Sequence, residues 1–388
     1  MEMKEEIYLD NAATSWPKPE CVYQAVDTFN RKIGASPGRG SHSRTITAGQ
    51  VLLDARESLA QLFNIKDSSR VIFTANVTAA INIALKGLLE PGDHVVISSM
   101  EHNAVARPLH SLKEKGVELT VVQCAPDGSL DPLLVEQAIT GRTRLVCLLH
   151  ASNLTGTIMP IVEVGRIAHR KGALFMVDAA QTAGVLPVDV EEHKIDILAF
   201  TGHKGLLGPQ GTGGLYIRPS LEIQTFIEGG TGSLSEQVYQ PDFMPDKFES
   251  GTPNTPGIAG LGAGVKFIQE TGIETIRRHE QALTDLLIRG LKEIPGVILY
   301  GPGDSERQVA VVSFNIEGRD CGEVSFLLDQ RHGIQCRSGL HCAPLAHQTL
   351  GTVKSGACRI SPGFFNTADD INKAIRAVCE IAKSGLGL

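Results

Sequence analysis

The runs Ala173-Leu-Phe-Met-Val177 and Ile195-Asp-Ile-Leu-Ala-Phe200 are short and mostly apolar. Similar runs occur earlier in the chain, at Val71–Thr74, Val95–Ser98 and Leu145–His150, and apolar residues at helical spacing lie between them. Strands that are apolar on both faces and joined by helices are typical of a mostly parallel sheet covered on both sides. The sequence therefore predicts an α/β fold, in which ligands bind beyond the carboxyl ends of the strands.

The pattern changes after the turn-rich segment Gly251–Gly257. A long helical pattern follows from about Ile258 to Ile294, then a strand at Val309–Asn315 and an amphipathic helix from Ala368 to Lys383, with Thr367 as its possible cap. These elements predict a smaller α+β domain. We expect a large domain formed by residues 15–257 and a small domain formed by residues 1–14 and 258–388.

Charge and composition narrow the class of protein. The chain of 388 residues carries 36 lysines and arginines against 43 aspartates and glutamates, a net charge of −7. This balance argues against a protein that coats nucleic acid or an anionic membrane. The basic, glycine-rich stretch from Gly34 to Arg44 has no interleaved aromatic residue, so we do not expect it to bind RNA.

The N-terminus, Met1 to Glu6, is charged and leads into no apolar run, and no stretch approaches the ~20 apolar residues of a membrane span. We therefore expect a cytoplasmic protein. Its eight cysteines are scattered without a CxxC pair, so a disulfide framework is not expected and most of the cysteines should be small core residues.

Asp178 and Lys204 each follow a predicted strand. Taken alone, the acid could equally be a helix cap, and the lysine a surface residue. Together, at neighbouring strand ends, they are typical of a pyridoxal phosphate site, in which the lysine forms a Schiff base and the carboxylate keeps the ring nitrogen protonated. The strand-to-helix junction Phe73–Ala80, with the hydroxyl of Thr78, offers donors for a phosphate, although a plain N-cap also explains it.

Seven short motifs then occur in order along the chain. They are Tyr8-Leu-Asp-Asn-Ala-Ala-Thr14, Met100-Glu-His-Asn-Ala-Val105, His150-Ala-Ser-Asn-Leu-Thr-Gly156, Asp178-Ala-Ala-Gln181, Thr201-Gly-His-Lys204, Gly251-Thr-Pro-Asn254 and Arg337-Ser-Gly-Leu-His-Cys342. From about residue 7 to 380 the chain resembles class V aminotransferase-fold enzymes, and most closely the cysteine desulfurases of the SUF type. The resemblance implies a fold-type I pyridoxal phosphate enzyme, with a mostly parallel seven-stranded sheet in the large domain and a smaller α+β C-terminal domain.

The resemblance also implies roles for individual residues. Lys204 would be the Schiff-base lysine, Asp178 would pair with the ring nitrogen, and Gln181 would hydrogen-bond the phenolic oxygen of the cofactor. His102 would stack on the ring and shuttle protons. The residues that would complete the cofactor site, most of them at its phosphate, are Val77, Thr78, Thr201, His203 and Thr252, the last reaching across a homodimer to the phosphate of the partner subunit.

Asn153 and Arg359 would take the carboxylate of the substrate, L-cysteine or L-selenocysteine. Cys342 would be the nucleophile, because desulfuration needs a thiolate that attacks the substrate sulfur and leaves alanine and a persulfide. Arg337, His341 and His347 are close to it in sequence and could lower the pKa of its thiol.

A zinc site is the alternative for this part of the chain. Its ligands would be Cys336, His341, Cys342 and His347. Their spacing fits no common zinc pattern, so we predict no metal.

The segment around Cys342 departs from the SUF-type pattern, Arg-x-Gly-His-His-Cys, because Leu340 replaces the first histidine. This change leaves open the sulfur acceptor and the preference for cysteine or selenocysteine. The segment is also short, unlike the long mobile loops of the housekeeping desulfurases, which implies a nearly fixed nucleophile that hands sulfur to a visiting acceptor protein.

The predicted function is therefore that of a homodimeric, pyridoxal phosphate-dependent cysteine desulfurase. A selenocysteine lyase would use the same cofactor set. A true aminotransferase or another C–S lyase of class V would leave Cys342 without a role, and a catalytically silent sulfur carrier or binding scaffold is a further alternative.

Overall fold

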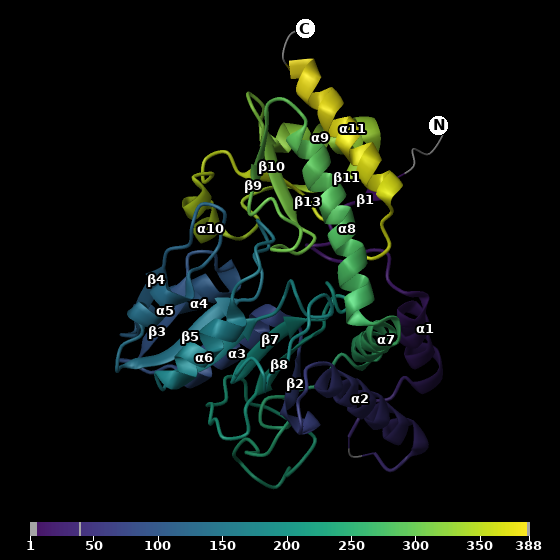
Figure 1. Ribbon diagram of the computed structural model, residues 1–388. Helices are drawn as coiled ribbons and strands as arrows, with labels where there is room; N and C mark the ends of the chain where they lie inside the picture. The colour runs from purple at the N-terminus through teal and green to yellow at the C-terminus, as the bar shows by residue number, and fades with distance from the viewer. Residues whose placement is uncertain (1–5, 39, 386–388) are drawn as a thin grey trace.

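The computed structural model describes residues 6–38 and 40–385, which form a larger and a smaller body (Figure 1). Residues 1–5, at the N-terminus where we expect no secretion signal, and Arg39, within the Gly34–Arg44 stretch, lie outside the described residues. Within the described ranges, no helix combines the length and apolar character that a membrane span requires.

The larger body is built on a seven-stranded sheet of order β2-β8-β7-β6-β5-β3-β4. Among its strands, β8 alone is antiparallel to its two neighbours, and the other pairs are parallel. This confirms the predicted α/β fold with a mostly parallel sheet. The strands are β2 (Val71–Thr74), β3 (His94–Ser98), β4 (Glu118–Val122), β5 (Thr143–Leu149), β6 (Leu174–Asp178), β7 (Ile197–Thr201) and β8 (Gly213–Ile217).

Helices cover both faces of this sheet, because the central strands are apolar on both sides. In β5, Val146 and Leu148 belong to a core that is closed by α2, α6 and α7, whereas Leu145 and Cys147 belong to a second core that is closed by α3 and α4. The helices of the larger body are α1 (Glu20–Thr28) with a π-helical turn (Phe29–Ile33), α2 (Ser43–Leu62), α3 (Val77–Leu88), α4 (Asn103–Lys113), α5 (Pro132–Ala138), α6 (Ile161–Arg170) and α7 (Thr255–Thr271).

The smaller body has an antiparallel sheet of order β12-β13-β10-β9 and a parallel pair, β1-β11. Its core lies between these strands and helices α8, α9 and α11, which agrees with the predicted α+β domain (Figure 1). Its elements are β1 (Ile7–Tyr8), α8 (Ile273–Lys292), β9 (Val297–Tyr300), β10 (Val312–Ile316), α9 (Cys321–His332), β11 (Ile334–Gln335), β12 (Arg337–Gly339), α10 (Pro344–Leu350), β13 (Ala357–Ile360) and α11 (Ala368–Gly385).

The structure corrects our interpretation of the long helical pattern from Ile258 to Ile294, because this stretch forms two helices. Gly272, with a φ of 86°, ends α7 and precedes α8; glycine adopts positive φ without the cost that a side chain adds. Leu261 and Val265 of α7 lie in the core of the large sheet. Helix α7 therefore packs with the larger body, and the predicted division of the chain after residue 257 stays a prediction.

The start of the described chain packs with the smaller body. Ile7 pairs with Ile334, and Asp10 forms a bridge with Ser361. The side chains of Ile7 and Leu9 belong to the core of the smaller body. The segment that follows then crosses to the larger body, where the N–H of Ser15 donates to the carbonyl oxygen of His203. This crossing brings the first motif of the sequence next to the loop that carries Lys204.

Candidate active site

The predicted site residues lie just beyond the carboxyl ends of the strands. His102 follows β3, Asn153 follows β5, Asp178 ends β6 and Lys204 follows β7. Parallel strands end at one edge of a sheet, so these side chains converge. They share a cavity of about 330 Å³ lined by Val77, His102, Leu149, Ala151, Asn153, Asp178, Ala180, Gln181 and Lys204.

Asp178 and Lys204 supply a carboxylate and an amine to this cavity. Burial raises the pKa of Asp178, opposed by the N–H of Ala180, which donates to Oδ1 at 2.9 Å, and by the charge of Lys204. Burial lowers the pKa of Lys204 to about 8, opposed by Asp178 and assisted by Arg359. Within the described chain, neither Lys204 Nζ nor Asp178 Oδ2 has a hydrogen-bond partner. Both groups are therefore free to bind a ligand.

His102 forms another wall of the cavity and caps α4. Its Nδ1 accepts a hydrogen bond from the N–H of Ala104 at 3.0 Å. Burial, assisted by the charges of Lys204 and Arg107, lowers the pKa of His102 to about 4. The imidazole is therefore neutral at neutral pH, with its proton on Nε2. This neutral form suits the predicted stacking on an aromatic ring.

The N-terminus of α3 offers donors for an anion. Asn76 caps the helix, with Oδ1 accepting from the N–H of Ala79 at 2.9 Å. The N–H groups of Val77 and Thr78 and the Thr78 hydroxyl have no partner among the described residues, and Nδ1 of His203 is likewise buried without one. Free donors and the helix dipole favour a phosphate here.

Four residues that we expected at the phosphate do not line this cavity, namely Thr78, Thr201, His203 and Thr252. Thr201 is 1% exposed, and its hydroxyl lies 3.5 Å from the carbonyl oxygen of Thr212. Thr252 is exposed in the segment before α7. Its predicted role concerns the other subunit of a dimer and stays a prediction, as does that of Thr201.

Asn153 and Arg359 are joined to each other. Arg359 Nη1 donates to the carbonyl oxygen of Asn153 at 2.9 Å, and Nη2 donates to Asp10 Oδ1, also at 2.9 Å. Asp10 Oδ2 accepts from Arg337 Nε at 3.0 Å. Within the described chain, Arg359 Nε and Asn153 Oδ1 are buried without a partner. Arg359 Nε is therefore a donor without a partner for the substrate carboxylate that we expect these two residues to hold.

Asp10→Asn is expected to lower the free energy of unfolding by about 3 kcal/mol, because it leaves the buried guanidinium of Arg359 without a counter-charge. Urea unfolding of the purified protein measures this. The matched control is Asp27→Asn, which breaks the exposed ion pair with Arg31 and should change the free energy of unfolding much less. Equal losses in the two variants would contradict a structural role for Asp10.

Cys342 lies in the short loop between β12 and α10. Its carbonyl oxygen accepts from the N–H of Asn103 at 2.8 Å, and the carbonyl oxygen of His341 accepts from Asn153 Nδ2 at 2.7 Å. His341 and Cys342 both have positive φ, 48° and 55°, which few non-glycine residues adopt. The thiol of Cys342 is exposed and borders a second, larger groove shared with Thr78 and His102. A constrained backbone thus holds the thiol beside the first cavity.

The structure corrects the expectation that the neighbouring histidines activate the thiol of Cys342. Burial lowers the pKa of His341 to about 3, and burial also lowers the pKa of His347. Both rings are therefore neutral, and the guanidinium of Arg337 is engaged by Asp10. His347 Nδ1 is hydrogen-bonded to the hydroxyl of Thr352 at 2.7 Å. Among residues 6–38 and 40–385, no three His, Cys, Asp or Glu side chains are grouped so that they could hold a metal ion.

Most of the other cysteines are core residues, as expected. Cys124, Cys147, Cys321 and Cys358 are buried, and Cys336 and Cys379 are half-buried. Besides Cys342, Cys21 is the exception, because it is exposed on α1. All eight cysteines are free thiols.

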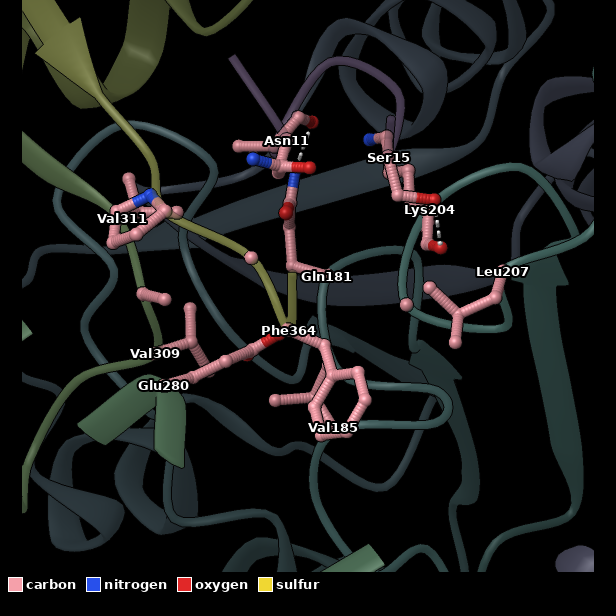
Figure 2. Close-up of a pocket in the computed structure, with 15 residues that line it drawn as sticks. Asn11, Ser15, Gln181, Val185, Lys204, Leu207, Glu280, Val309, Val311 and Phe364 are labelled. Atoms are coloured by element: carbon pink, nitrogen blue, oxygen red, sulfur yellow. Dashed lines mark hydrogen bonds between the residues drawn. The ribbon is translucent and has the colours of Figure 1, made fainter. Parts of the chain in front are cut away.

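A third cavity, of about 440 Å³, is lined by residues of both bodies, among them Gln181 and Lys204 (Figure 2). Glu280 of α8 points into it. The side chain of Glu280 is 7% exposed, and its carboxyl group has no hydrogen-bond or ion-pair partner among the described residues. Burial raises the pKa of this carboxyl to about 8, opposed by the charge of Arg277.

Glu280→Gln is expected to make the protein more stable than the wild type at pH 8, with little difference at pH 4. Between the ordinary pKa of 4.5 and about 8 the folded protein keeps a proton that the unfolded chain loses, so the free energy of unfolding of the wild type falls as pH rises. Each pKa unit corresponds to ~1.4 kcal/mol. Urea unfolding of both proteins across this range measures the difference, and a difference independent of pH would contradict the assignment.

The residues of the first cavity fit pyridoxal phosphate. Lys204 provides an amine for an aldehyde, Asp178 provides a free carboxylate oxygen for a ring nitrogen, and the start of α3 provides unpaired donors for a phosphate. The fit rests on atoms that are buried or enclosed and yet lack partners in the described chain.

Sequence reasoning missed Asp10 and Glu101. Asp10 stands in the first motif, but only the fold brings it to Arg359. Glu101 is fully buried, accepts hydrogen bonds from the Ser98 hydroxyl at 2.6 Å and from the N–H of Leu149, and has its pKa raised to about 8 by burial. Leu149 pairs with Asp178 across β5 and β6, so Glu101 supports the strand that positions Asp178. The adjacent His102 is the signal that could have marked Glu101.

Comparisons with known proteins agree with this geometry. A family model described as aminotransferase class V matches residues 7–374. A probable cysteine desulfurase from Methanothermobacter thermautotrophicus is 39% identical over 394 residues, which cover 99% of this chain and 96% of that protein. The cysteine desulfurase of Serratia proteamaculans is 34% identical over 390 residues, covering 97% and 93%.

Solved structures show the same likeness. The apo structure of a cysteine desulfurase from Thermococcus onnurineus NA1 superposes with a TM-score of 0.92 at 34% identity, covering 98% of this chain and 95% of that one. The chain therefore belongs to the class V aminotransferase family. Its relatives place it among the cysteine desulfurases of that family.

Proposed function

We propose that this chain uses pyridoxal phosphate to convert L-cysteine into L-alanine and keeps the sulfur as a persulfide on Cys342. The observation that carries the proposal is the shared cavity of Lys204, Asp178 and His102, with the exposed thiol of Cys342 on the groove that adjoins it at His102. An amine, a carboxylate and a nucleophilic thiol in this arrangement supply the groups that C–S cleavage requires.

Each side chain would have a defined task. When bound, pyridoxal phosphate would supply an electron sink for the α-carbon of the substrate. Lys204 would hold the aldehyde and then take the α-proton, for which its lowered pKa suits it. Asp178 would face the ring nitrogen, and Gln181 the phenolic oxygen.

The thiolate of Cys342 would attack the substrate sulfur. The new S–S bond forms as the C–S bond breaks, and the electron pair of that bond goes to the β-carbon, which takes a proton to give alanine. Asn153 and Arg359 would hold the substrate carboxylate, for which Arg359 Nε is a buried donor that lacks a partner in the described chain. The constrained loop of Cys342 would keep the thiol at a set distance from the reacting atoms.

The proposal includes a homodimer in which Thr252 reaches the phosphate in the partner subunit, and a thiol protein that receives the sulfur. It also places the reaction in the cytoplasm, where the free cysteines would stay reduced. Neither a nucleic acid nor a membrane is part of the proposal.

Incubation with L-cysteine tests the proposal. We expect stoichiometric alanine in the first turnover, and one added sulfur atom in the mass of the peptide that contains Cys342. Pyruvate, or alanine without modification of Cys342, would point instead to another C–S lyase or an aminotransferase. A parallel assay with L-selenocysteine separates a selenocysteine lyase, which would act on that substrate alone.

A further inference from the structure

The groove that borders Cys342 runs between α3 and α4 and has a volume of about 890 Å³. Apart from Cys342, its polar wall consists of two rows, one on each helix, with His102 at the end near Cys342. The rows are Thr78, Asn82 and Lys86 on α3, and Asn103, Arg107 and Ser111 on α4.

The spacing of these rows sets the length of the groove. In each row the residues are four positions apart, so they lie on one face of the helix. Eight residues at 1.5 Å per residue extend over about 12 Å, which matches an extended peptide of about four residues. Both helices begin at the edge of the sheet where the site lies, so both rows lead away from Cys342.

The groove is basic although the chain has a net charge of −7. Lys86 and Arg107 are the charged residues that line it, and none of its described lining residues is acidic. Arg107 is exposed and has no hydrogen-bond or ion-pair partner in the described chain, and its charge contributes to the lowered pKa of His102. Lys86 Nζ lies 4.9 Å from the ring centroid of Phe226, a contact that leaves its charge available.

A single amino acid is too short for this groove. The residues proposed to hold the substrate, Asn153 and Arg359, do not line it. The occupant must reach the exposed thiol of Cys342 at one end and satisfy two cations along about 12 Å. These requirements fit an extended anionic segment that carries a thiol.

We propose that the groove binds an acidic, thiol-bearing segment of the protein that receives sulfur from Cys342; this inference rests on the proposed function. In the transfer, the thiolate of that segment attacks the outer sulfur of the Cys342 persulfide. A new S–S bond forms on the acceptor, the S–S bond at Cys342 breaks, and Cys342 leaves as a thiolate with the electron pair. The exchange needs no external oxidant or reductant.

Two synthetic thiol peptides of equal length test the inference, one with its cysteine flanked by glutamates and one with lysines. The enzyme is first loaded with L-cysteine and freed of excess substrate, and the sulfur on each peptide is then followed by mass spectrometry. We expect the acidic peptide to be at least about tenfold faster. The double variant Lys86→Glu and Arg107→Glu should remove or reverse this preference.

The matched control is Arg144→Glu with Lys171→Glu, two exposed cations at the opposite edge of the sheet, which should keep the wild-type preference. The ratio of the two peptide rates is compared within each variant, so a change in alanine formation, which precedes the transfer and is common to both peptides, does not enter it. Equal rates for the two peptides with the wild type would overturn the inference, as would a groove variant that slows only the use of L-cysteine. If the wild type forms no persulfide on Cys342, the proposed function itself fails, and the inference fails with it.

Discussion

Replacing Lys204 with alanine is expected to abolish the visible absorbance of bound pyridoxal phosphate and to reduce alanine formation by about 10³-fold or more. Lys204 supplies the amine among the described residues that line the cavity, and its pKa, lowered to about 8, makes the neutral amine accessible near neutral pH. The measurement is an absorbance spectrum after incubation with the cofactor and dialysis, followed by an alanine assay.

Lys18→Ala is the matched control for this experiment. Burial also lowers the pKa of Lys18 to about 8, and its Nζ donates to the carbonyl oxygen of His203 at 2.8 Å, next to Lys204 in the chain. Lys18 does not line the cavity of Asp178 and His102. The Lys18 variant should keep its colour, and a Lys204 variant with the wild-type spectrum would refute the assignment of the cofactor lysine.

Replacing Cys342 with alanine is expected to lower the release of alanine from L-cysteine by about 10²- to 10⁴-fold, because no other described cysteine lines the groove next to His102. The absorbance of the bound cofactor should persist, since Cys342 is not among the residues lining the cavity of Lys204. Steady-state alanine assays and spectra of the same preparation separate loss of the nucleophile from loss of the cofactor.

Cys21→Ala is the control for the second experiment, because Cys21 is the other exposed cysteine and lies on α1. The Cys21→Ala variant should keep wild-type turnover. In the wild-type protein, Cys21 itself should gain no stable sulfur atom. Full turnover in the Cys342 variant would mean that the chain cleaves or transaminates its substrate without a thiol nucleophile, and the proposed function would be wrong.

The sheet and the centre of the site could be predicted because their determinants are local. The apolar runs that end in Asp178, or lead to Lys204, predict a buried strand with a polar group at its end. Parallel strands bring such ends together at one edge of the sheet. The motifs then named His102, Asn153 and Cys342, which the structure places around the same cavity or its adjoining groove.

Other features depend on contacts between distant segments. The ion pair of Asp10 and Arg359 joins residues that are 349 positions apart in the sequence. Glu280 of α8 is buried because residues from both bodies surround it. The expected help of His341 and His347 to Cys342 failed for the same reason: nearness in sequence says nothing about burial, and burial keeps both rings neutral.

The order of residues alone was therefore enough to predict the α/β class, the family and the side chains of the candidate site, because hydrophobic periodicity and short motifs act over a few neighbouring positions. Tertiary structure decided which polar atoms lack partners, which charges are neutralised and which helices form the basic groove beside Cys342. Those properties depend on desolvation and on distances between segments that meet only when the chain folds.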